Sequence, residues 1–385
     1  MHDFMLHRPT RLLFGEGQIA RIAEEIPEYA RLMITYGGGS IKQNGVLEQV
    51  YRALDGRFHV EFGGIEPNPS YQTLCRAIDL AREEGVDFIL AVGGGSVIDG
   101  TKFIAGALRY DGDPWDIVAK RQRLVFDAVP FGCVLTLPAT GSEFNEGAVI
   151  SRPETGDKLD FHSPNVIPRF SVLDPTTTYS LPPRQIANGV VDTFVHTTEQ
   201  YLTYPVDAKL QDRFAEGLLL TLIEDGPRAL EEPENYSVRA NIMWAATMAL
   251  SGYIGSGVPH DWASHMIGHE LTALHGIDHA QSLAVVLPSL LRLTREAKRA
   301  KLLQYAERVW NLREGSEEQR IDAAIEATRG FFERMGMPTR LSGHGLDGSG
   351  IPTIVDKLVE HGMVALGEHR DITPDISRQI LENAI

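Results

Sequence analysis

Short β-rich runs alternate with helix-like stretches over residues 30–175, and this alternation limits the possible folds more than any other feature of the chain. Such a pattern is typical of a parallel sheet covered by helices, because each crossover helix returns the chain to the same end of the sheet. The runs expected to form strands span residues 32–36, 60–62, 88–92, 133–137 and 170–173. We therefore predict an α/β domain over residues 1–180 that binds a nucleotide.

Past Leu181-Pro182-Pro183 the strand-like runs become rare, and helical periodicity dominates. The clearest helical segments span residues 207–223, 295–310 and 317–335. We see no internal repeat and no low-complexity linker, so we expect a packed junction near residue 180 rather than a flexible tether. Residues 181–385 are predicted to form an all-helical domain.

The charge of the chain restricts its partners. Its formal net charge is −16 over 385 residues, without any lysine- or arginine-rich block. Nucleic acids and anionic membranes both require a concentrated positive patch, so we expect neither as a partner. Two cysteines are too few for a disulfide framework, and the N-terminal residues do not read as a secretory signal. We expect a cytoplasmic protein whose partners are small molecules.

Residues 240–259 carry no charge, and their number is about that needed to span a bilayer. Closely spaced glycines and Pro259 interrupt this segment. We therefore predict a buried helix that ends in a turn, and not a membrane span.

Two glycine runs stand where strands are expected to end. They are Gly37-Gly38-Gly39-Ser40 and Gly93-Gly94-Gly95-Ser96, and each leads directly into a helix-like segment. Glycine lets the backbone approach a pyrophosphate, and a helix N-terminus supplies free amide donors. Turns after strands also use glycine for conformational reasons alone, and neither run is a true GxGxxG or Walker motif. Two such runs nevertheless favour a nucleotide cofactor.

The first glycine run also bears on which cofactor is bound. An NAD site usually carries an acidic side chain that accepts the ribose hydroxyls and repels a 2′-phosphate. No carboxylate stands in the first run, and Lys42 follows it, so we predict NADP(H). In the alternative, an acid from elsewhere folds into this corner and restores the preference for NAD(H).

Polar residues near the second run have two possible readings. Asp99 and Lys102 lie one helical turn apart. They form either a surface ion pair that contributes little stability or part of the cofactor site. The strand end at residues 137–143 carries hydroxyls that either meet the same cofactor or belong to a simple turn.

A cluster of histidines with an upstream aspartate points to a metal. Asp192 and His196 stand four residues apart and share one face of a predicted helix. The same spacing recurs twice, in His265 with His269 and in His275 with His279. A lone histidine is more often a core or surface group than a ligand, but this cluster favours a metal site. Carboxylate and imidazole together suit Fe(II) or Zn(II) as a Lewis acid for a carbonyl.

Residues 240–291 contain neither lysine nor arginine, although they surround the histidine cluster. A phosphorylated or carboxylated substrate would usually require a basic partner, so we expect a small neutral substrate. For the same reason, a metal-dependent carbocyclic synthase of related fold that uses NAD transiently is the less favoured alternative. A non-catalytic protein that binds metal or nucleotide is the third hypothesis.

The motifs of the chain, taken together, resemble those of the iron-containing alcohol dehydrogenase family. The resemblance is strongest to its NADPH-dependent butanol dehydrogenases and broad-range aldehyde reductases. It rests on Gly-Ile-Glu-Pro-Asn-Pro at residues 64–69, on residues 93–102 and 139–143, and on the long segment 173–199. It implies a Rossmann-like N-terminal domain and an all-helical C-terminal domain, the dehydroquinate synthase-like fold. It also implies an active-site cleft between the domains, a homodimer and broad aldehyde reduction.

The resemblance also assigns roles to individual residues. It implies the metal ligands Asp192, His196, His265 and His279. It implies that the cofactor contacts are Gly37, Gly38, Gly39, Ser40, Gly94, Gly95, Ser96, Asp99, Thr136, Thr140, Asn145 and Lys158. His269 would line the cleft, and we assign it to proton relay, because imidazole titrates near neutral pH. An equal alternative is that His269 orients a metal ligand.

Overall fold

The computed structural model describes residues 1–120 and 124–385, which form two compact units. The first, here called the α/β unit, comprises His7–Leu181 and Pro233–Thr247. The second, the helical unit, comprises Met1–Leu6, Pro182–Glu232 and Met248–Ile385. The N-terminal segment Met1–Leu6 thus belongs to the helical unit, which is otherwise built from the second half of the sequence. Conversely, Pro233–Thr247 belongs to the α/β unit, which is otherwise built from the first half.

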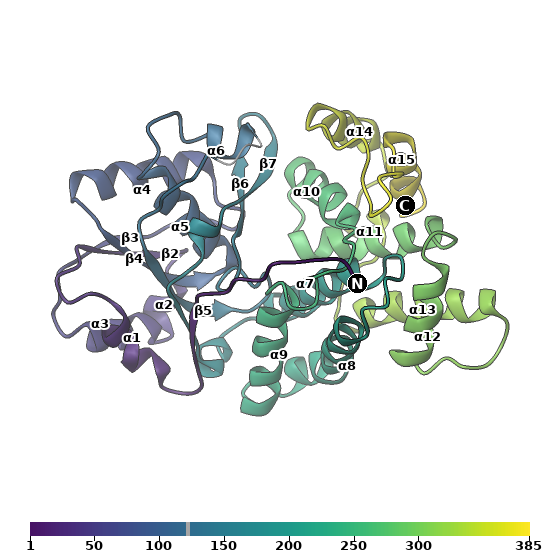
Figure 1. Ribbon diagram of the computed structural model, residues 1–385, viewed down its shortest axis with the longest axis horizontal. Helices are drawn as coiled ribbons and strands as arrows, with labels where there is room; N and C mark the ends of the chain where they lie inside the picture. The colour runs from purple at the N-terminus through teal and green to yellow at the C-terminus, as the bar shows by residue number, and fades with distance from the viewer. Residues whose placement is uncertain (121–123) are drawn as a thin grey trace. The chain divides into compact units, whose positions relative to one another are not determined.

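A six-stranded parallel sheet forms the centre of the α/β unit (Figure 1). Its order is β1-β8-β5-β4-β2-β3. The strands are β1 (Arg11–Phe14), β2 (Leu32–Tyr36), β3 (His59–Phe62), β4 (Phe88–Gly94), β5 (Phe131–Leu137) and β8 (Phe170–Leu173). The predicted α/β fold class is confirmed, and all five predicted strands are present.

Three strands were absent from the prediction. One is β1, at the edge of the main sheet, and the others are β6 (Gly147–Arg152) and β7 (Asp157–His162), which pair antiparallel in a separate two-stranded sheet. Both β6 and β7 contain charged residues, as in Asp-Lys-Leu-Asp-Phe-His of β7. Such sequences lack the apolar run of a strand buried on both faces.

Helices cover both faces of the main sheet (Figure 1). On one face lie α4 (Tyr71–Glu83) and α5 (Gly95–Ala107), and on the other lie α1 (Ile22–Glu25), α2 (Ser40–Gln43) and α3 (Val46–Leu54). Strand β4 is buried on both faces, since Ile89 packs into the first core and Leu90 into the second. Each fully buried aliphatic side chain contributes about 1.5–3 kcal/mol. The remaining elements of the unit are η1 (Gln18–Arg21), α6 (Asp116–Ala119), η2 (Pro164–Val166) and η3 (Pro175–Thr178).

The order of the strands places both glycine runs at one point of the sheet. From β2 the chain moves outward to the edge strand β3, and it then returns to the other side of β2 as β4. Strands β2 and β4 are therefore neighbours that flank the point where the winding direction reverses. Ligands of open parallel sheets bind at the carboxyl ends of the strands at such a switch point.

The helical unit is built around α7 (Pro183–Tyr201), which is buried along most of its length and packs against α8 and α11. Its other helices are α8 (Lys209–Glu231), α10 (Ala263–His275), α11 (His279–Leu293), α12 (Arg299–Arg308), α13 (Glu317–Arg334), η4 (Leu341–His344), α14 (Ile351–Glu360) and α15 (Pro374–Glu382). Phe194 of α7 contacts Phe331 and Phe332 of α13 at ring-centroid distances of 5.1 and 5.4 Å. The predicted helical second half is confirmed.

The uncharged segment at residues 240–259 contains the end of α9 (Tyr236–Ala249) and the turns that follow it. In the part of the chain that the structure describes, no helix combines the length and apolarity needed to cross a membrane.

Candidate functional site

Helix α7 provides one wall of the candidate metal site. Asp192 and His196 are four residues apart, so they project from the same face, and their residues are only 3% and 4% exposed. His196 Nδ1 lies 3.6 Å from Asp192 Oδ1. A carboxylate and an imidazole are thus held close together inside the helical unit.

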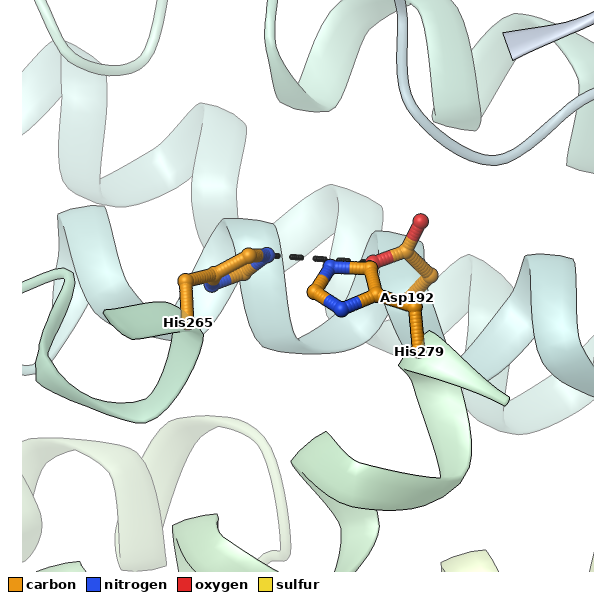
Figure 2. A group of neighbouring side chains, drawn as sticks. All are labelled: Asp192, His265 and His279. Carbon is orange, nitrogen blue, oxygen red and sulfur yellow. Dashed lines mark ion pairs between the residues drawn. The ribbon is translucent and has the colours of Figure 1, made fainter. Parts of the chain in front are cut away.

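Two further imidazoles approach the same carboxylate oxygen from α10 and α11 (Figure 2). His265 Nε2 lies 3.8 Å and His279 Nε2 3.9 Å from Asp192 Oδ1. Ligand atoms of Asp192, His265 and His279 all lie within 4.8 Å of one another, and this group of three does not include His196. Tetrahedral ligands at about 2.1 Å from an ion are roughly 3.4 Å apart. The spacing and chemistry of these donors therefore fit one divalent transition-metal ion.

A short connection places His279 beside α7. Helix α10 ends at His275 and is followed by Gly276, which has a φ of 67°, and α11 begins at His279. Asp278, in the connection, accepts hydrogen bonds at Oδ2 from Arg184 Nε at 2.7 Å and from Asn188 Nδ2 at 2.8 Å. Both donors belong to α7, so this carboxylate fixes the start of α11 against the helix that carries Asp192.

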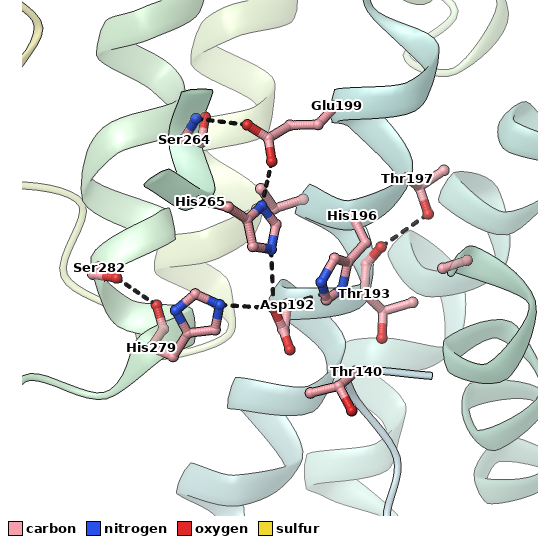
Figure 3. Close-up of polar contacts among 12 residues, drawn as sticks. Thr140, Asp192, Thr193, His196, Thr197, Glu199, Ser264, His265, His279 and Ser282 are labelled. Atoms are coloured by element: carbon pink, nitrogen blue, oxygen red, sulfur yellow. Dashed lines mark hydrogen bonds and ion pairs between the residues drawn. The ribbon is translucent and has the colours of Figure 1, made fainter. Parts of the chain in front are cut away.

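Glu199 of α7 is a member of the site that sequence reasoning missed (Figure 3). Its carboxylate accepts a hydrogen bond from Ser264 N at 2.6 Å and contacts His265 Nδ1. Burial disfavours the charged imidazole, but Glu199 and Asp192 outweigh this effect and raise the pKa of His265 to about 9. The signal was its spacing, since Glu199 follows His196 by three residues and therefore lies near the same helix face.

The two remaining histidines of the predicted cluster occupy different places. His269 is 4% exposed, and its ring centroid lies 5.0 Å from that of His279 and 6.4 Å from that of His265. His275, the last residue of α10, instead lines a cavity of about 250 Å³ with residues of the loop before α14. Neither belongs to the group of three that could hold an ion.

The first glycine run leaves open space at the carboxyl end of β2. A Cβ atom built on Gly38 or Gly39 would meet no other atom within 4 Å. Gly39 has a φ of 98°, which itself favours glycine, whereas Gly38 does not have a positive φ. Neither packing nor backbone conformation therefore explains why residue 38 is a glycine.

Packing does account for the glycines of the second run, which lie at the end of β4 and the start of α5. A Cβ at Gly93, Gly94 or Gly95 would lie 2.6, 2.9 or 2.4 Å from a side-chain atom of Val97, Leu137 or Thr140, respectively. These glycines allow the strand, the helix and the loop after β5 to pack closely. Helix α5 spans 13 residues, and its N-terminus faces the edge where β2 and β4 end.

An acidic side chain does lie near the first glycine run, but other groups already bind it. Glu61 of β3 accepts hydrogen bonds from Tyr36 Oη at 3.0 Å and from Tyr51 Oη. Lys42 Nζ lies 3.7 Å from Glu61 Oε2 and 4.8 Å from the centroid of the Tyr36 ring. Burial opposes ionisation of Glu61, but the tyrosine hydroxyls and Lys42 outweigh it and hold its pKa below the ordinary value.

Asp99 and Lys102 are not a surface pair, since both are buried in α5. The Asp99 carboxylate accepts hydrogen bonds from Ser142 Oγ at 2.6 Å and from a backbone amide of β6 at 3.0 Å. Lys102 Nζ donates to Asn145 Oδ1 at 2.9 Å and to a β6 carbonyl at 2.7 Å. Burial lowers the pKa of Lys102 to about 8, against the attraction of Asp99. The pair thus ties α5 to the loop after β5 and to the β6–β7 hairpin.

The other predicted cofactor residues also lie in the α/β unit. Thr136 lies near the end of β5, and Thr140 follows it in the loop, where its carbonyl accepts a hydrogen bond from Asn145 Nδ2 at 3.2 Å. Ser96 lies in the first turn of α5, and its Oγ accepts a bond from a backbone amide at 3.3 Å. Lys158 is buried on β7.

Comparisons with known proteins cover both halves of the chain. The model for iron-containing alcohol dehydrogenases matches residues 9–175, and the model for the C-terminal part of the Fe-containing alcohol dehydrogenase family matches residues 186–385. The chain is 67% identical to the NADPH-dependent aldehyde reductase YqhD of Escherichia coli, with 100% of both proteins covered. It is 39% identical to a probable NADH-dependent butanol dehydrogenase of Bacillus subtilis, again with 100% of both covered.

Structural comparison agrees with these matches. The crystal structure of E. coli YqhD is similar with a TM-score of 0.99 at 66% identity, covering 100% of this chain and 99% of that chain. Nothing in these matches supports a carbocyclic synthase. The resemblance seen in the motifs is confirmed, and the chain belongs to the iron-containing alcohol dehydrogenase family.

Proposed function

We propose that the protein is a metal-dependent, NADP(H)-linked alcohol dehydrogenase that works as an aldehyde reductase on small neutral aldehydes. The observation that carries this proposal is the convergence of three imidazoles on one oxygen of the buried Asp192. Membership of the iron-containing alcohol dehydrogenase family and the similarity to a protein named as an NADPH-dependent aldehyde reductase support it.

We assign the metal ligands to Asp192, His196, His265 and His279. An Fe(II) or Zn(II) ion bound by them would supply a Lewis acid for the carbonyl of the substrate. Asp192 contributes the negative charge that such an ion requires, and the imidazoles contribute neutral nitrogen donors. Asp192, His196 and His265 are buried away from water, whereas the side chain of His279 is 21% exposed.

His269 is proposed as the group that moves a proton. It lies one helical turn after His265, and its ring neighbours that of His279. Imidazole exchanges protons near neutral pH, and reduction of an aldehyde to an alcohol consumes one proton. The alternative role for His269 is to orient His279.

The nucleotide is proposed to bind at the shared carboxyl edge of β2 and β4. We assign its contacts to Gly37, Gly38, Gly39, Ser40, Gly94, Gly95, Ser96, Asp99, Thr136, Thr140, Asn145 and Lys158. Gly38 gives the best support, because the open space beside it serves no packing purpose within the protein. A homodimer and a cytoplasmic location are further parts of the proposal.

Family membership does not decide the cofactor, because relatives are named for NADPH and for NADH. The Gly38→Asp variant tests it, since this position has open space and no positive φ. A carboxylate beside a 2′-phosphate should cost about 2–3 kcal/mol, so kcat/KM for NADPH should fall roughly 30- to 150-fold. The value for NADH should change much less. Steady-state kinetics with both cofactors measure this, and Gly38→Asn is the uncharged control.

Glu61 offers a second test of the same corner. The Glu61→Gln variant removes the carboxylate that engages Lys42 and leaves Lys42 available to a 2′-phosphate. Because an exposed ion pair contributes up to about 1 kcal/mol, the KM for NADPH should fall about two- to fivefold, and that for NADH should stay the same. Glu48→Gln is the matched control, because Glu48 pairs instead with Arg52 on α3. Equal changes in the KM for NADPH and the KM for NADH would contradict the assignment of the 2′-phosphate to this corner.

The experiment that tests the whole proposal follows NADPH oxidation at 340 nm with butanal as substrate. Chelator-treated protein is assayed alone and after addition of Fe(II) or Zn(II), with NADH in parallel. Metal-dependent consumption of NADPH supports the proposal. Tight binding of metal and nucleotide without turnover of any aldehyde would instead indicate a non-catalytic protein.

A further inference from the structure

Glu199 fastens the beginning of α10 to α7 through three hydrogen bonds. One carboxylate oxygen, Oε1, accepts from Ser264 N at 2.6 Å, and the other, Oε2, contacts His265 Nδ1. Its backbone carbonyl accepts from Asp261 N at 2.9 Å. Its side chain is only 1% exposed, so solvent does not compete for the carboxylate. Glu199 therefore holds both the backbone and the imidazole of the first turn of α10.

The contact with Glu199 determines which nitrogen of His265 faces the metal site. An ionised carboxylate only accepts hydrogen bonds, so the proton of the imidazole must be on Nδ1. The other nitrogen, Nε2, lies 3.8 Å from Asp192 Oδ1, and among the described residues it has no hydrogen-bond partner. Once the imidazole is neutral, its lone pair is on Nε2 and points toward Asp192.

We propose that Glu199 is a positioning residue for the metal site, which selects Nε2 of His265 as the coordinating atom and fixes the orientation of its ring. This inference rests on the proposed function, because it assumes that His265 is a metal ligand. Glu199 itself contacts neither metal nor substrate. A carboxylate that accepts the second N–H of a ligating histidine also makes the imidazole a stronger donor.

The Glu199→Gln variant places a hydrogen-bond donor where the unchanged protein has an acceptor, with almost no change in side-chain volume. An amide oxygen can still accept from Ser264 N, but the amide NH₂ then faces His265 Nδ1 and donates to it. The imidazole proton is thereby displaced to Nε2, which can no longer coordinate. We expect the affinity for Zn(II) or Co(II) to fall about 10- to 100-fold. The visible absorption of bound Co(II) should change as well, because the ligand field is altered.

A second buried carboxylate–imidazole pair serves as the matched control. Glu270 of α10 lies 2.7 Å from His361 Nδ1, and both side chains are buried. Glu270→Gln also removes one buried negative charge, here from α10, the helix that carries His265, but His361 is not among the proposed ligands. This variant should bind Co(II) with the affinity and spectrum of the unchanged protein.

Three measurements on chelator-treated protein decide the matter: the metal dissociation constant, the Co(II) spectrum and the thermal midpoint. A weaker metal site in Glu199→Gln with a midpoint close to that of the unchanged protein supports the proposal. Unchanged affinity and spectrum would overturn it, whatever happens to the midpoint. If Glu199→Gln does not fold, Glu199→Asp decides, because the shorter side chain cannot reach both Ser264 N and His265 Nδ1. Unaltered metal binding in Glu199→Asp would then reject the role.

The same experiment separates this inference from the proposed function. If Asp192→Asn binds Co(II) as well as the unchanged protein does, the metal is not at this site, and the proposed function fails. If Asp192→Asn loses the metal and Glu199→Gln keeps it unchanged, only the role of Glu199 is refuted.

Discussion

The Asp192→Asn variant is expected to bind Fe(II) or Zn(II) roughly two to three orders of magnitude more weakly than the unchanged protein. Asp192 Oδ1 is the one atom that all three imidazoles approach, at 3.6, 3.8 and 3.9 Å. A structural Zn(II) site is worth about 10–16 kcal/mol, so loss of one of four ligands should cost about 3–4 kcal/mol. Metal titration and NADPH-dependent reduction of butanal should show parallel losses.

The control for this prediction is His275→Asn. His275 lies on α10, the helix that carries His265, but it lines a separate cavity. Its replacement should leave the metal affinity unchanged. In the absence of metal, Asp192→Asn should retain the circular dichroism of the unchanged protein, because asparagine has the same shape as aspartate. Full activity in Asp192→Asn would remove the basis of the metal assignment.

The Lys298→Met variant is expected to destabilise the helical unit by about 3–5 kcal/mol, because it leaves two buried carboxylates without their cation. Lys298 Nζ lies 2.8 Å from Asp261 Oδ2 and 2.7 Å from Glu368 Oε1, and all three side chains are at most 3% exposed. Burial opposes its charge, but the two carboxylates outweigh this and raise the pKa of Lys298. For a unit of this size, the apparent midpoint of thermal unfolding should fall by about 6–20 °C.

An exposed lysine provides the comparison for this prediction. Lys209 lies 3.6 Å from Asp207, and both side chains are more than 80% exposed. Lys209→Met should therefore shift the midpoint by less than about 2 °C. Differential scanning calorimetry of chelator-treated protein measures both variants. Equal small shifts would mean that water or a structural change compensates the two carboxylates near Lys298.

The sequence predicts the main sheet well because its central strands are buried on both faces. The run Phe-Ile-Leu-Ala-Val of β4 has no polar position, and two core clusters account for this. The strand β1 lies at the edge of the main sheet, and β6 and β7 form a separate two-stranded sheet. None of these three strands is enclosed by the two cores on both faces. Their mixed composition therefore does not distinguish them from loops.

The histidine cluster shows where sequence reasoning about the site stops. Helical spacing correctly predicts that Asp192 and His196 share one face, but it treats His269 and His275 in the same way as His265 and His279. The way α7, α10 and α11 cross decides which of these imidazoles approach Asp192. The local periodicity of the sequence does not predict how helices cross. The role of Asp278 in fixing α11 to α7 is likewise a tertiary contact between residues that are 90 or more positions apart.

The exchange of short segments between the two units has a consequence for synthesis on the ribosome. Pro233–Thr247 belongs to the α/β unit, and Met243 is part of its hydrophobic core. The nascent chain must therefore emerge past Thr247, after the whole of α7 and α8, before the N-terminal unit can complete its core. Vectorial folding of one unit after the other, which is usual for multidomain chains, is thereby delayed. A fragment that ends at Leu181 should accordingly expose apolar surface and aggregate.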